Sequence, residues 1–216
     1  NPKNFKFKTD LIGEFNKYNI LAAIAACKQL GISDNDIKTG IESFVPPLGR
    51  EEVVYKKDFT VMIDFAHTPN AFDQILKSIR PTIKGRLIHV FGSAGLRDMT
   101  KRPLMGKISC QYADIIILTS EDPRSESIES INNGIKSEIP HFAKASRGKQ
   151  NSVHLIEIPD RREAIEAAIR MAEKGDFVLI TGKSHEKSMN YGHGEIPWDE
   201  YETVNKILKI KKIKKL

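Results

Sequence analysis

Short apolar, β-branched runs alternate with helical patterns through most of this 216-residue chain. Strands and helices that alternate at these lengths predict right-handed βαβ units, and hence an α/β fold whose mostly parallel sheet is flanked by helices. The segment from 51 to 60 is compatible with a further edge strand. The expected strands lie near 61–64, 86–91, 114–119, 153–158 and 176–181, and the expected helices near 69–79, 100–112, 126–138, 160–174 and 199–211.

Two of the expected helices begin with a capping signal. Thr68 is a favourable N-cap residue, and Pro69 suits the first helical position because it has no N–H to satisfy. Asp160 and Glu163 have the spacing of a capping box. Both signals support the boundaries of the helices that follow.

A break at residues 45–49, Val-Pro-Pro-Leu-Gly, divides the chain. Two helical patterns, 11–30 and 33–44, precede it. We therefore place a boundary between residues 1–47 and 48–216. The first part is too short for an independent core, so we expect it to be the tail of a larger upstream domain, with the chain's start as a cut.

The net charge of +6 comes from the end of the chain. Lys206–Leu216 holds six of the 34 basic residues and no acid, which leaves 28 bases against 28 acids elsewhere. No aromatic side chains interleave with those lysines, so we expect no nucleic-acid partner. No apolar run approaches the roughly 20 residues of a membrane helix, so we expect no membrane insertion. The only cysteines, Cys27 and Cys110, indicate a reducing compartment and hence a cytoplasmic location.

Polar clusters follow four of the five expected strands, at the point where each strand ends. They are Asp64–Pro69, Gly92–Asp98, Thr119–Arg124 and Thr181–Glu186. In α/β sheets, ligands bind at the carboxyl ends of the strands. Because these ends meet at one edge of the sheet, the four clusters together predict a binding site there.

The glycine-containing cluster is compatible with an anion site or with glycines that serve only the geometry of the turn. Gly92 and Gly95 lie between a strand and a helix N-terminus, where backbone N–H groups can hold an anion. Arg97, Lys101 and Arg102 follow, and cations at a helix N-terminus oppose the helix dipole unless an anion binds. The spacing of a phosphate-binding P-loop, G-x-x-x-x-G-K-[ST], occurs nowhere in the chain.

The cluster that contains Arg124 offers charges of both signs. Pro123 stiffens the loop, and the guanidinium of Arg124 is a planar fork for a carboxylate. Glu121 and Asp122 either neutralise Arg124 within the protein or bind the ammonium group of a ligand. A loop with both signs suits an amino acid, which is a zwitterion.

The remaining two clusters carry further candidates. Gly182 allows close approach of a ligand to the backbone, and Glu186 is suited to bind an amine. His185 is interpreted as a capping or hydrogen-bonding residue, with a general base as the alternative. Asp64 and His67 suit contact with a nucleotide better than a metal site or an acid/base pair.

Taken in order, these clusters resemble motifs of the Mur ligases, and most closely those of the members that add the third amino acid of the peptidoglycan peptide. The resemblance covers nearly the whole chain. The matching segments are Asp64–Pro69 (D-Y-A-H-T-P with Phe for Tyr), Phe91–Gly106 (F-G-C-G-G-D-R-D-x-x-K-R-P-L-M-G), Glu121–Arg124 (D-N-P-R), Gly182–Glu186 (G-K-G-H-E), Gly13–Asn19 and Gly49–Glu52.

The resemblance implies a three-domain enzyme of which this chain is one part. Residues 1–47 would be the C-terminal helices of the central ATPase domain, and residues 48–216 the Rossmann-like C-terminal domain. The implied reaction is ATP-dependent amide formation, in which ATP phosphorylates the D-glutamate side chain of UDP-N-acetylmuramoyl-L-alanyl-D-glutamate and a free amino acid displaces phosphate. ATP and Mg²⁺ would bind mostly outside this chain, which we therefore expect to be inactive alone.

The resemblance also implies the roles of individual residues. No catalytic residue and no metal ligand is assigned within the chain, and a monomer is expected. Asn16, Arg50, Asp64 and His67 would face the nucleotide, and Arg97, Glu121, Asp122, Pro123, Arg124, Gly182 and Glu186 would bind the incoming amino acid.

Three departures from the family motifs bear on the choice of amino acid. Leu96 replaces an acid, Asp122 replaces Asn and Ser184 replaces Gly. Arg124 is the residue that the members using meso-diaminopimelate keep, whereas Asp122 adds negative charge beside it. The alternatives are a lysine-adding enzyme, a sister amide ligase of the folylpolyglutamate or cyanophycin synthetase type, and a non-catalytic amino-acid-binding module.

Overall fold

The computed structural model describes residues 5–139 and 153–213. The chain divides into two compact units, Asn1–Pro47 and Leu48–Leu216. The polar segment 141–151, expected to be a surface loop, and the last residues of the Lys-rich tail lie outside the described residues. None of the described helices combines the length and apolar character needed to cross a bilayer.

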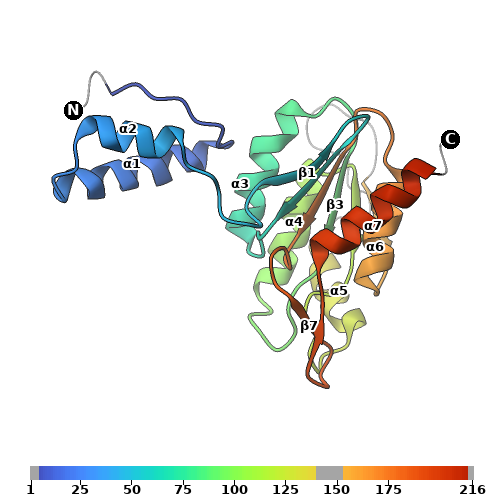
Figure 1. The fold of residues 1–216 in the computed structure, drawn as a ribbon. Helices are drawn as coiled ribbons and strands as arrows, with labels where there is room; N and C mark the ends of the chain where they lie inside the picture. Colours follow the sequence, from blue (N-terminus) through green and yellow to red (C-terminus); the bar gives the residue numbers. More distant parts are fainter. Residues whose placement is uncertain (1–4, 140–152, 214–216) are drawn as a thin grey trace. The chain divides into compact units, whose positions relative to one another are not determined.

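The first unit is a pair of helices, α1 (Glu14–Gln29) and α2 (Asp34–Glu42) (Figure 1). Ile20, Ile24 and Ile37 are buried between them. Ser33 caps α2 by accepting a hydrogen bond from the backbone N–H of Asp36 at 3.2 Å, which satisfies one of the free donors of the first turn. Both helices are shorter than their sequence patterns, by one to three residues at each end.

The second unit contains a six-stranded sheet in the order β1-β2-β6-β3-β4-β5. All neighbours are parallel except the edge pair β1–β2, which is antiparallel. The mostly parallel sheet predicted from the alternating pattern is thus confirmed. The strands are β1 (Glu52–Lys56), β2 (Thr60–Asp64), β3 (Leu87–Phe91), β4 (Ile115–Leu118), β5 (His154–Glu157) and β6 (Phe177–Thr181).

Helices cover both faces of this sheet (Figure 1). One core cluster joins α3 (Pro69–Ile79), α4 (Lys101–Tyr112) and α5 (Ile128–Lys136) to one face, and a second joins α6 (Arg161–Met171) and α7 (Glu200–Ile213) to the other. A short 3₁₀ turn, Arg80–Thr82, follows α3. The chain therefore runs outward from β3 to β5 on one face and returns to β6 across the other.

The four central strands, β2, β6, β3 and β4, are mainly apolar on both sides, as strands covered on two faces require. In β6, Phe177 and Leu179 enter the first cluster, whereas Val178 and Ile180 enter the second. Each such buried side chain stabilises the fold by roughly 1.5–3 kcal/mol. This two-faced burial is why the runs read as continuous apolar segments.

The predicted helix caps are present. Thr68 accepts a hydrogen bond from the N–H of Ala71 at 3.3 Å, and Asp160 accepts one from the N–H of Glu163 at 2.9 Å. A small hairpin, β7 (Ser188–Asn190) and β8 (Glu195–Pro197), was not expected from the sequence. Strands of three residues are too short to show an alternating pattern.

Candidate active site at the carboxyl edge of the sheet

Four neighbouring strands, β2, β6, β3 and β4, carry the four polar clusters at their carboxyl ends. Their register aligns these ends: Asp64 pairs with Thr181, and Phe91 pairs with Leu118. The helices that follow β2 and β3 cover one face, while the chain that enters β6 comes from the other. A crevice at such a change of direction is where open α/β sheets bind ligands.

Asp64 organises the loops at the end of β2. It is 7% exposed, and its Oδ1 accepts from the N–H of Ala66 at 2.7 Å. Its Oδ2 accepts from the N–H of Glu51 at 2.9 Å, a residue with a φ of +49°. Both carboxylate oxygens thus bind backbone, so this side chain shapes the loop.

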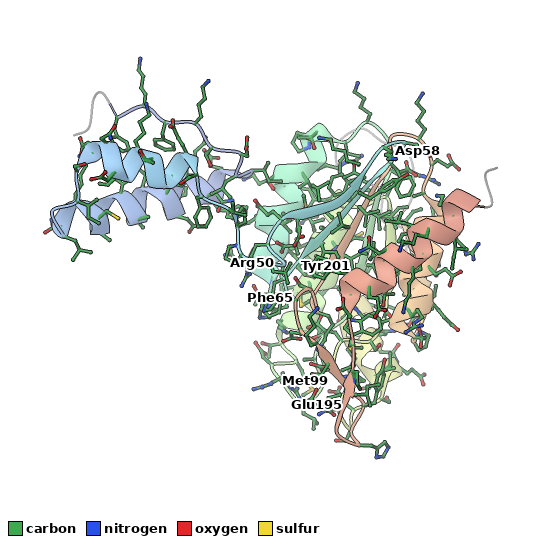
Figure 2. All side chains as sticks on the ribbon, viewed as in Figure 1. Arg50, Asp58, Phe65, Met99, Glu195 and Tyr201 are labelled. Carbon is green, nitrogen blue, oxygen red and sulfur yellow. The ribbon has the colours of Figure 1, made fainter. Side chains whose placement is uncertain are left out.

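An aromatic side chain lies beside this loop. The Phe65 ring has the guanidinium carbon of Arg50 4.9 Å from its centroid (Figure 2), and the His67 and His185 rings lie 4.9 Å and 4.8 Å away. The backbone oxygen of His67 accepts from Lys101 Nζ at 2.8 Å. Arg50 and His67 are therefore brought together around one apolar surface.

Gly92 and Gly95 serve close packing between two loops. A Cβ on Gly92 would lie 2.3 Å from the backbone oxygen of Thr119, and one on Gly95 would lie 1.9 Å from that of Pro123. The N–H of Gly95 donates to the backbone oxygen of Asp122 at 3.0 Å. This N–H is already hydrogen-bonded, so it is not available to bind an anion. Gly95 therefore serves the geometry of the turn.

The three cations near the start of α4 have different roles. Arg102 is buried and forms a two-pronged ion pair with Glu126, at 2.6 Å and 2.7 Å, whose hydrogen bonds lower the Glu126 pKa to about 2. Lys101 binds the backbone of His67, whereas Arg97 is exposed and makes no hydrogen bond or ion pair within the described ranges. The prediction that all three cations bind an anionic ligand is wrong for Arg102, because Glu126 is already its partner.

The clusters after β4 and β6 join through a buried lysine. Lys183 is 1% exposed, and its Nζ lies 2.9 Å from both carboxylate oxygens of Asp122 and 2.6 Å from Glu186. Asp122 also accepts from the N–H of Asn190 at 2.9 Å. Asp122 is therefore neutralised by Lys183 and not by Arg124.

Arg124 is held in an unusual backbone conformation. Its φ is +53°, and that of Asp122 is +44°, so two non-glycine residues adopt left-handed conformations on either side of Pro123. The guanidinium donates to the backbone oxygen of Gly95 at 2.5 Å, and the backbone N–H donates to Asn190 of β7 at 2.9 Å. Such strain is typical of functional loops, where the surroundings fix the geometry.

Glu121 lies at the strand-end edge, in contact with the positions of Gly92 after β3 and Gly182 after β6. It is 7% exposed, and its Oε2 is buried without a hydrogen bond to any described residue. A Cβ on Gly182 would lie 2.2 Å from this oxygen, and Gly182 has a φ of +105°. Burial raises the pKa of Glu121 to about 8, although Arg161, Lys101 and Lys183 act to lower it.

A family model described as "Mur ligase, glutamate ligase domain" matches residues 49–184. The chain belongs to the Mur ligase family. Two curated relatives illustrate the similarity. The UDP-N-acetylmuramoyl-L-alanyl-D-glutamate–2,6-diaminopimelate ligase of Aquifex aeolicus is 43% identical over 206 residues, and the UDP-N-acetylmuramyl-tripeptide synthetase of Borreliella afzelii is 41% identical over 208. Each alignment covers 95% of this chain but only 40% of the relative, so the chain spans less than half of their length.

Solved structures show the same relationship. A UDP-N-acetylmuramoyl-L-alanyl-D-glutamate–2,6-diaminopimelate ligase superposes with a TM-score of 0.69 at 32% identity, covering 95% of this chain and 40% of that one. A folylpolyglutamate synthase from Mycobacterium tuberculosis superposes with a TM-score of 0.61 at 19% identity, covering 82% and 39%. At that identity the second likeness concerns the fold alone.

The remaining predicted residues of this Mur ligase chain lie as follows. Pro123 is buried beneath the loop after β3. Asn16 belongs to the first unit, where its Nδ2 donates to the backbone oxygen of Ile12 at 2.7 Å within α1. The strand-end edge therefore brings together ten of the eleven predicted residues on four adjacent strands and their flanking loops, and Asn16 is described within its own unit.

Sequence reasoning missed Arg161, which supports the loops of the crevice from below. It is fully buried, and its guanidinium donates to Glu200 at 2.6 Å and 2.8 Å. It also donates to the backbone oxygens of Ser120 at 3.2 Å and Thr181 at 2.8 Å, which belong to two of the clusters. Glu200 further accepts from Trp198 Nε1 at 3.0 Å. The only local sequence signal for Arg161 is its position directly after the helix cap, Asp160.

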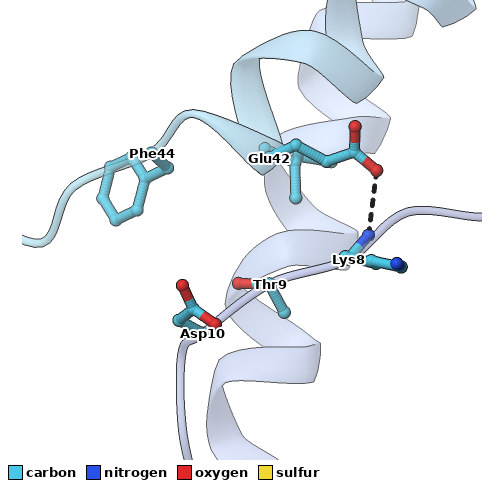
Figure 3. A pocket seen from close by; sticks show the side chains of 6 residues that line it. Lys8, Thr9, Asp10, Glu42 and Phe44 are labelled. Atoms are coloured by element: carbon cyan, nitrogen blue, oxygen red, sulfur yellow. Dashed lines mark hydrogen bonds between the residues drawn. The ribbon is translucent and has the colours of Figure 1, made fainter.

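The first unit contains a separate hollow of about 410 Å³ (Figure 3). The backbone N–H of Lys8 donates to Glu42 across it at 3.0 Å. None of the predicted site residues lines this hollow, so it is not the candidate site. It is lined by Lys8, Thr9, Asp10, Ile41, Glu42 and Phe44.

We predict that the stability of the Mur ligase chain depends on pH through Glu121. Its pKa rises from 4.5 to about 8 on folding, so between these values only the unfolded chain ionises, and stability falls as pH rises through this window. Glu121→Gln removes that dependence. Between pH 5 and 8.5 the variant should gain about 4 kcal/mol over wild type in urea unfolding, whereas Glu129→Gln, at an exposed carboxyl, should follow wild type. Parallel curves for Glu121→Gln and wild type would contradict the burial argument.

Proposed function

We propose that this chain is part of an ATP-dependent ligase that joins meso-diaminopimelate to the D-glutamate side chain of UDP-N-acetylmuramoyl-L-alanyl-D-glutamate. The names of the relatives support this reaction. The observation that carries the proposal is the union of opposite charges at one sheet edge, where Lys183 lies between Asp122 and Glu186, with Arg124 on the same loop as Asp122. That arrangement suits an amino acid, which presents an ammonium group and a carboxylate together.

The incoming amino acid would contact the loops after β4 and β6. Glu186, whose side chain is 40% exposed, offers a carboxylate to an ammonium group. Arg124 offers a guanidinium to a carboxylate, and Gly182 leaves room for close approach to the backbone. Arg97, exposed and unpaired among the described residues, supplies a second cation at the same edge.

Diaminopimelate differs from lysine by one further carboxylate, and the charges in the crevice favour it. The sequence predicts that Asp122 opposes a carboxylate beside Arg124. Lys183 binds both oxygens of Asp122 and also pairs with Glu186, so it offsets part of that negative charge. Arg124 itself has no carboxylate partner among the described residues, which favours the far carboxylate of diaminopimelate as its ligand.

The nucleotide would lie toward the end of β2. Arg50, Phe65 and His67 form a cationic and aromatic surface that suits a nucleotide, with Asp64 shaping the loop beneath. When bound, ATP supplies the phosphoryl group that activates the carboxylate, and Mg²⁺ offsets the charge of its phosphates. The described residues contain no group of three His, Cys, Asp or Glu that fits a metal, so no metal role is derived for them.

We extend the proposal to the organisation of the whole protein. Residues 1–47 would be the C-terminal helices of a central ATPase domain, and Asn16 would contribute to the nucleotide site from there. The protein would act as a cytoplasmic monomer.

The proposal is tested with the full-length protein, ATP and UDP-N-acetylmuramoyl-L-alanyl-D-glutamate. Phosphate release and the mass of the product are measured with diaminopimelate, lysine and ornithine. We expect diaminopimelate to be preferred at least tenfold in kcat/KM. No ATP-dependent product with any amino acid would refute ligase activity, and a preference for lysine would reassign the substrate.

Arg124→Ala should raise the KM for diaminopimelate about tenfold or more. A hydrogen-bonded charge pair contributes about 1.5–3 kcal/mol, and each 1.4 kcal/mol is tenfold in affinity. The KM for ATP should stay within about twofold, since two strands, β6 and β3, lie between β4, which precedes Arg124, and the β2 loop. Arg170→Ala is the control, because it also removes one arginine, at a half-exposed helical pair with Glu166. Equal changes in both KM values would contradict the assigned role.

A further inference from the structure

Glu121 is a buried acid at the carboxyl edge of the sheet, and one of its carboxylate oxygens has no hydrogen-bond partner among the described residues. Its Oε2 has no hydrogen bond to any described residue, and the Oγ of Ser93, 1% exposed at the end of β3, likewise has none among them. Buried polar atoms are normally bonded, so two such atoms on adjacent strand ends indicate a polar ligand or reactant at this point.

The position of the Glu121 side chain is defined by glycines on two strands. A Cβ on Gly92, after β3, would lie 3.0 Å from the Glu121 Cβ, and one on Gly182, after β6, would lie 2.7 Å from its carboxyl carbon. The side chain therefore starts at the end of β4, passes the end of β3 and reaches the end of β6. The carboxyl thus lies among the residues proposed to bind the amino acid.

The charged groups that face Glu121 are engaged with other partners. Arg161 of α6 binds Glu200, Lys183 binds Asp122 and Glu186, and Lys101 of α4 binds the backbone of His67. Asp122 is an acid that acts in the opposite sense and helps to raise the Glu121 pKa. The Glu121 carboxyl therefore lies near three positive charges but forms a hydrogen bond with none of them. It is thus available to exchange a proton with a ligand.

We propose that Glu121 accepts the proton that the amine of the incoming amino acid must lose before it attacks the activated carboxyl group. This inference rests on the proposed function. The N–H bond of the ammonium group breaks and its proton passes to the Glu121 carboxylate. The freed electron pair forms the C–N bond, the bond from the acyl carbon to the phosphate oxygen breaks, and phosphate leaves with the second proton of the nitrogen.

The protonation behaviour of Glu121 suits this role. Its pKa of about 8 lies close to neutral pH, where a general base is both partly ionised and basic enough to take a proton from an amine. An ordinary glutamate would be ionised but far too weak a base. Burial without a hydrogen-bond partner is thus what makes the carboxyl basic.

The test compares two nucleophiles in the full-length ligase. Diaminopimelate arrives as an ammonium ion, whereas hydroxylamine is already neutral at pH 7.5 and needs no base to attack the activated carboxyl. Glu121→Gln keeps the shape that fits against Gly182 but holds no exchangeable acid. We expect it to reduce kcat with diaminopimelate about 100-fold and to abolish the rise in rate up to pH 8, while hydroxamate formation stays within about threefold of wild type.

The other outcomes are equally decisive. Glu121→Asp should retain the pH-dependent rise at a lower rate, because it keeps a carboxyl. The inference is overturned if Glu121→Gln keeps the wild-type pH profile, or if it slows both nucleophiles equally, which would indicate a structural role. If the wild-type protein forms no ATP-dependent product with diaminopimelate or any other amino acid, the proposed function itself fails, and the two failures are thereby distinguished.

Discussion

Arg161→Met should lower the free energy of unfolding by about 3–5 kcal/mol, because it leaves Glu200 charged and buried without its partner. Both side chains are fully buried, and two hydrogen bonds join them. Burial lowers the pKa of Arg161, and the Glu200 carboxylate outweighs that effect and holds the pKa above its ordinary value. The variant also removes the donor to the backbone oxygens of Ser120 and Thr181.

The measurement is urea unfolding of the chain, followed by the fluorescence of Trp198, its single tryptophan and a direct hydrogen-bond partner of Glu200. Arg161→Met combined with Glu200→Gln should recover part of the loss, since no uncompensated charge remains. Arg170→Met is the matched control, because its pair with Glu166 is largely exposed and contributes about 1 kcal/mol or less. The argument would be contradicted if Arg161→Met lost less free energy of unfolding than the control Arg170→Met.

Gly95→Ala should reduce kcat/KM for the incoming amino acid about 100-fold or more. The new methyl group would lie 1.9 Å from the backbone oxygen of Pro123 and 2.7 Å from its carbonyl carbon. Backbone atoms have no rotamer that relieves such a contact, so the loops after β3 and β4 must separate. A displacement of about 1 Å at a reacting group costs on the order of 100-fold in rate, and overpacking costs about 1–3 kcal/mol of stability.

The control for this steric argument is Gly40→Ala. A Cβ at Gly40 meets no atom within 4 Å, and the residue lies inside α2, where alanine favours the helix by up to about 1 kcal/mol. Steady-state kinetics and melting temperatures of the full-length variants would show the contrast. If Gly95→Ala retains wild-type kcat/KM, the two loops are not required to touch.

The fold could be predicted from the sequence because its signals are local. The apolar runs of the four central strands are buried on both faces by neighbours that need not be identified in advance, and the caps at Thr68 and Asp160 act within three residues. The meeting of the four polar clusters at one edge of the sheet could be predicted equally well, since parallel strands bring their carboxyl ends together whatever their order. The β7–β8 hairpin escaped prediction because three-residue strands carry no periodicity.

The partners of charged residues could not be predicted, because they come from distant segments. The sequence predicted that Arg102 is a ligand-binding cation, but Arg102 forms an ion pair with Glu126, 24 residues later. Arg161 looked like an ordinary first-turn residue, although it meets Glu200 across 39 positions. A local pattern shows which charges are available and does not show which of them the fold has already paired.

The left-handed backbone at position 122 has a consequence for sequence drift in this family. Asparagine tolerates a positive φ at least as readily as aspartate, so an exchange between the two would leave the loop's shape intact. The electrostatic effect would fall on Lys183, which would keep only Glu186 as a neutralising partner. A single-nucleotide change can thus alter the net charge of the crevice by one unit without any rebuilding of the chain around it.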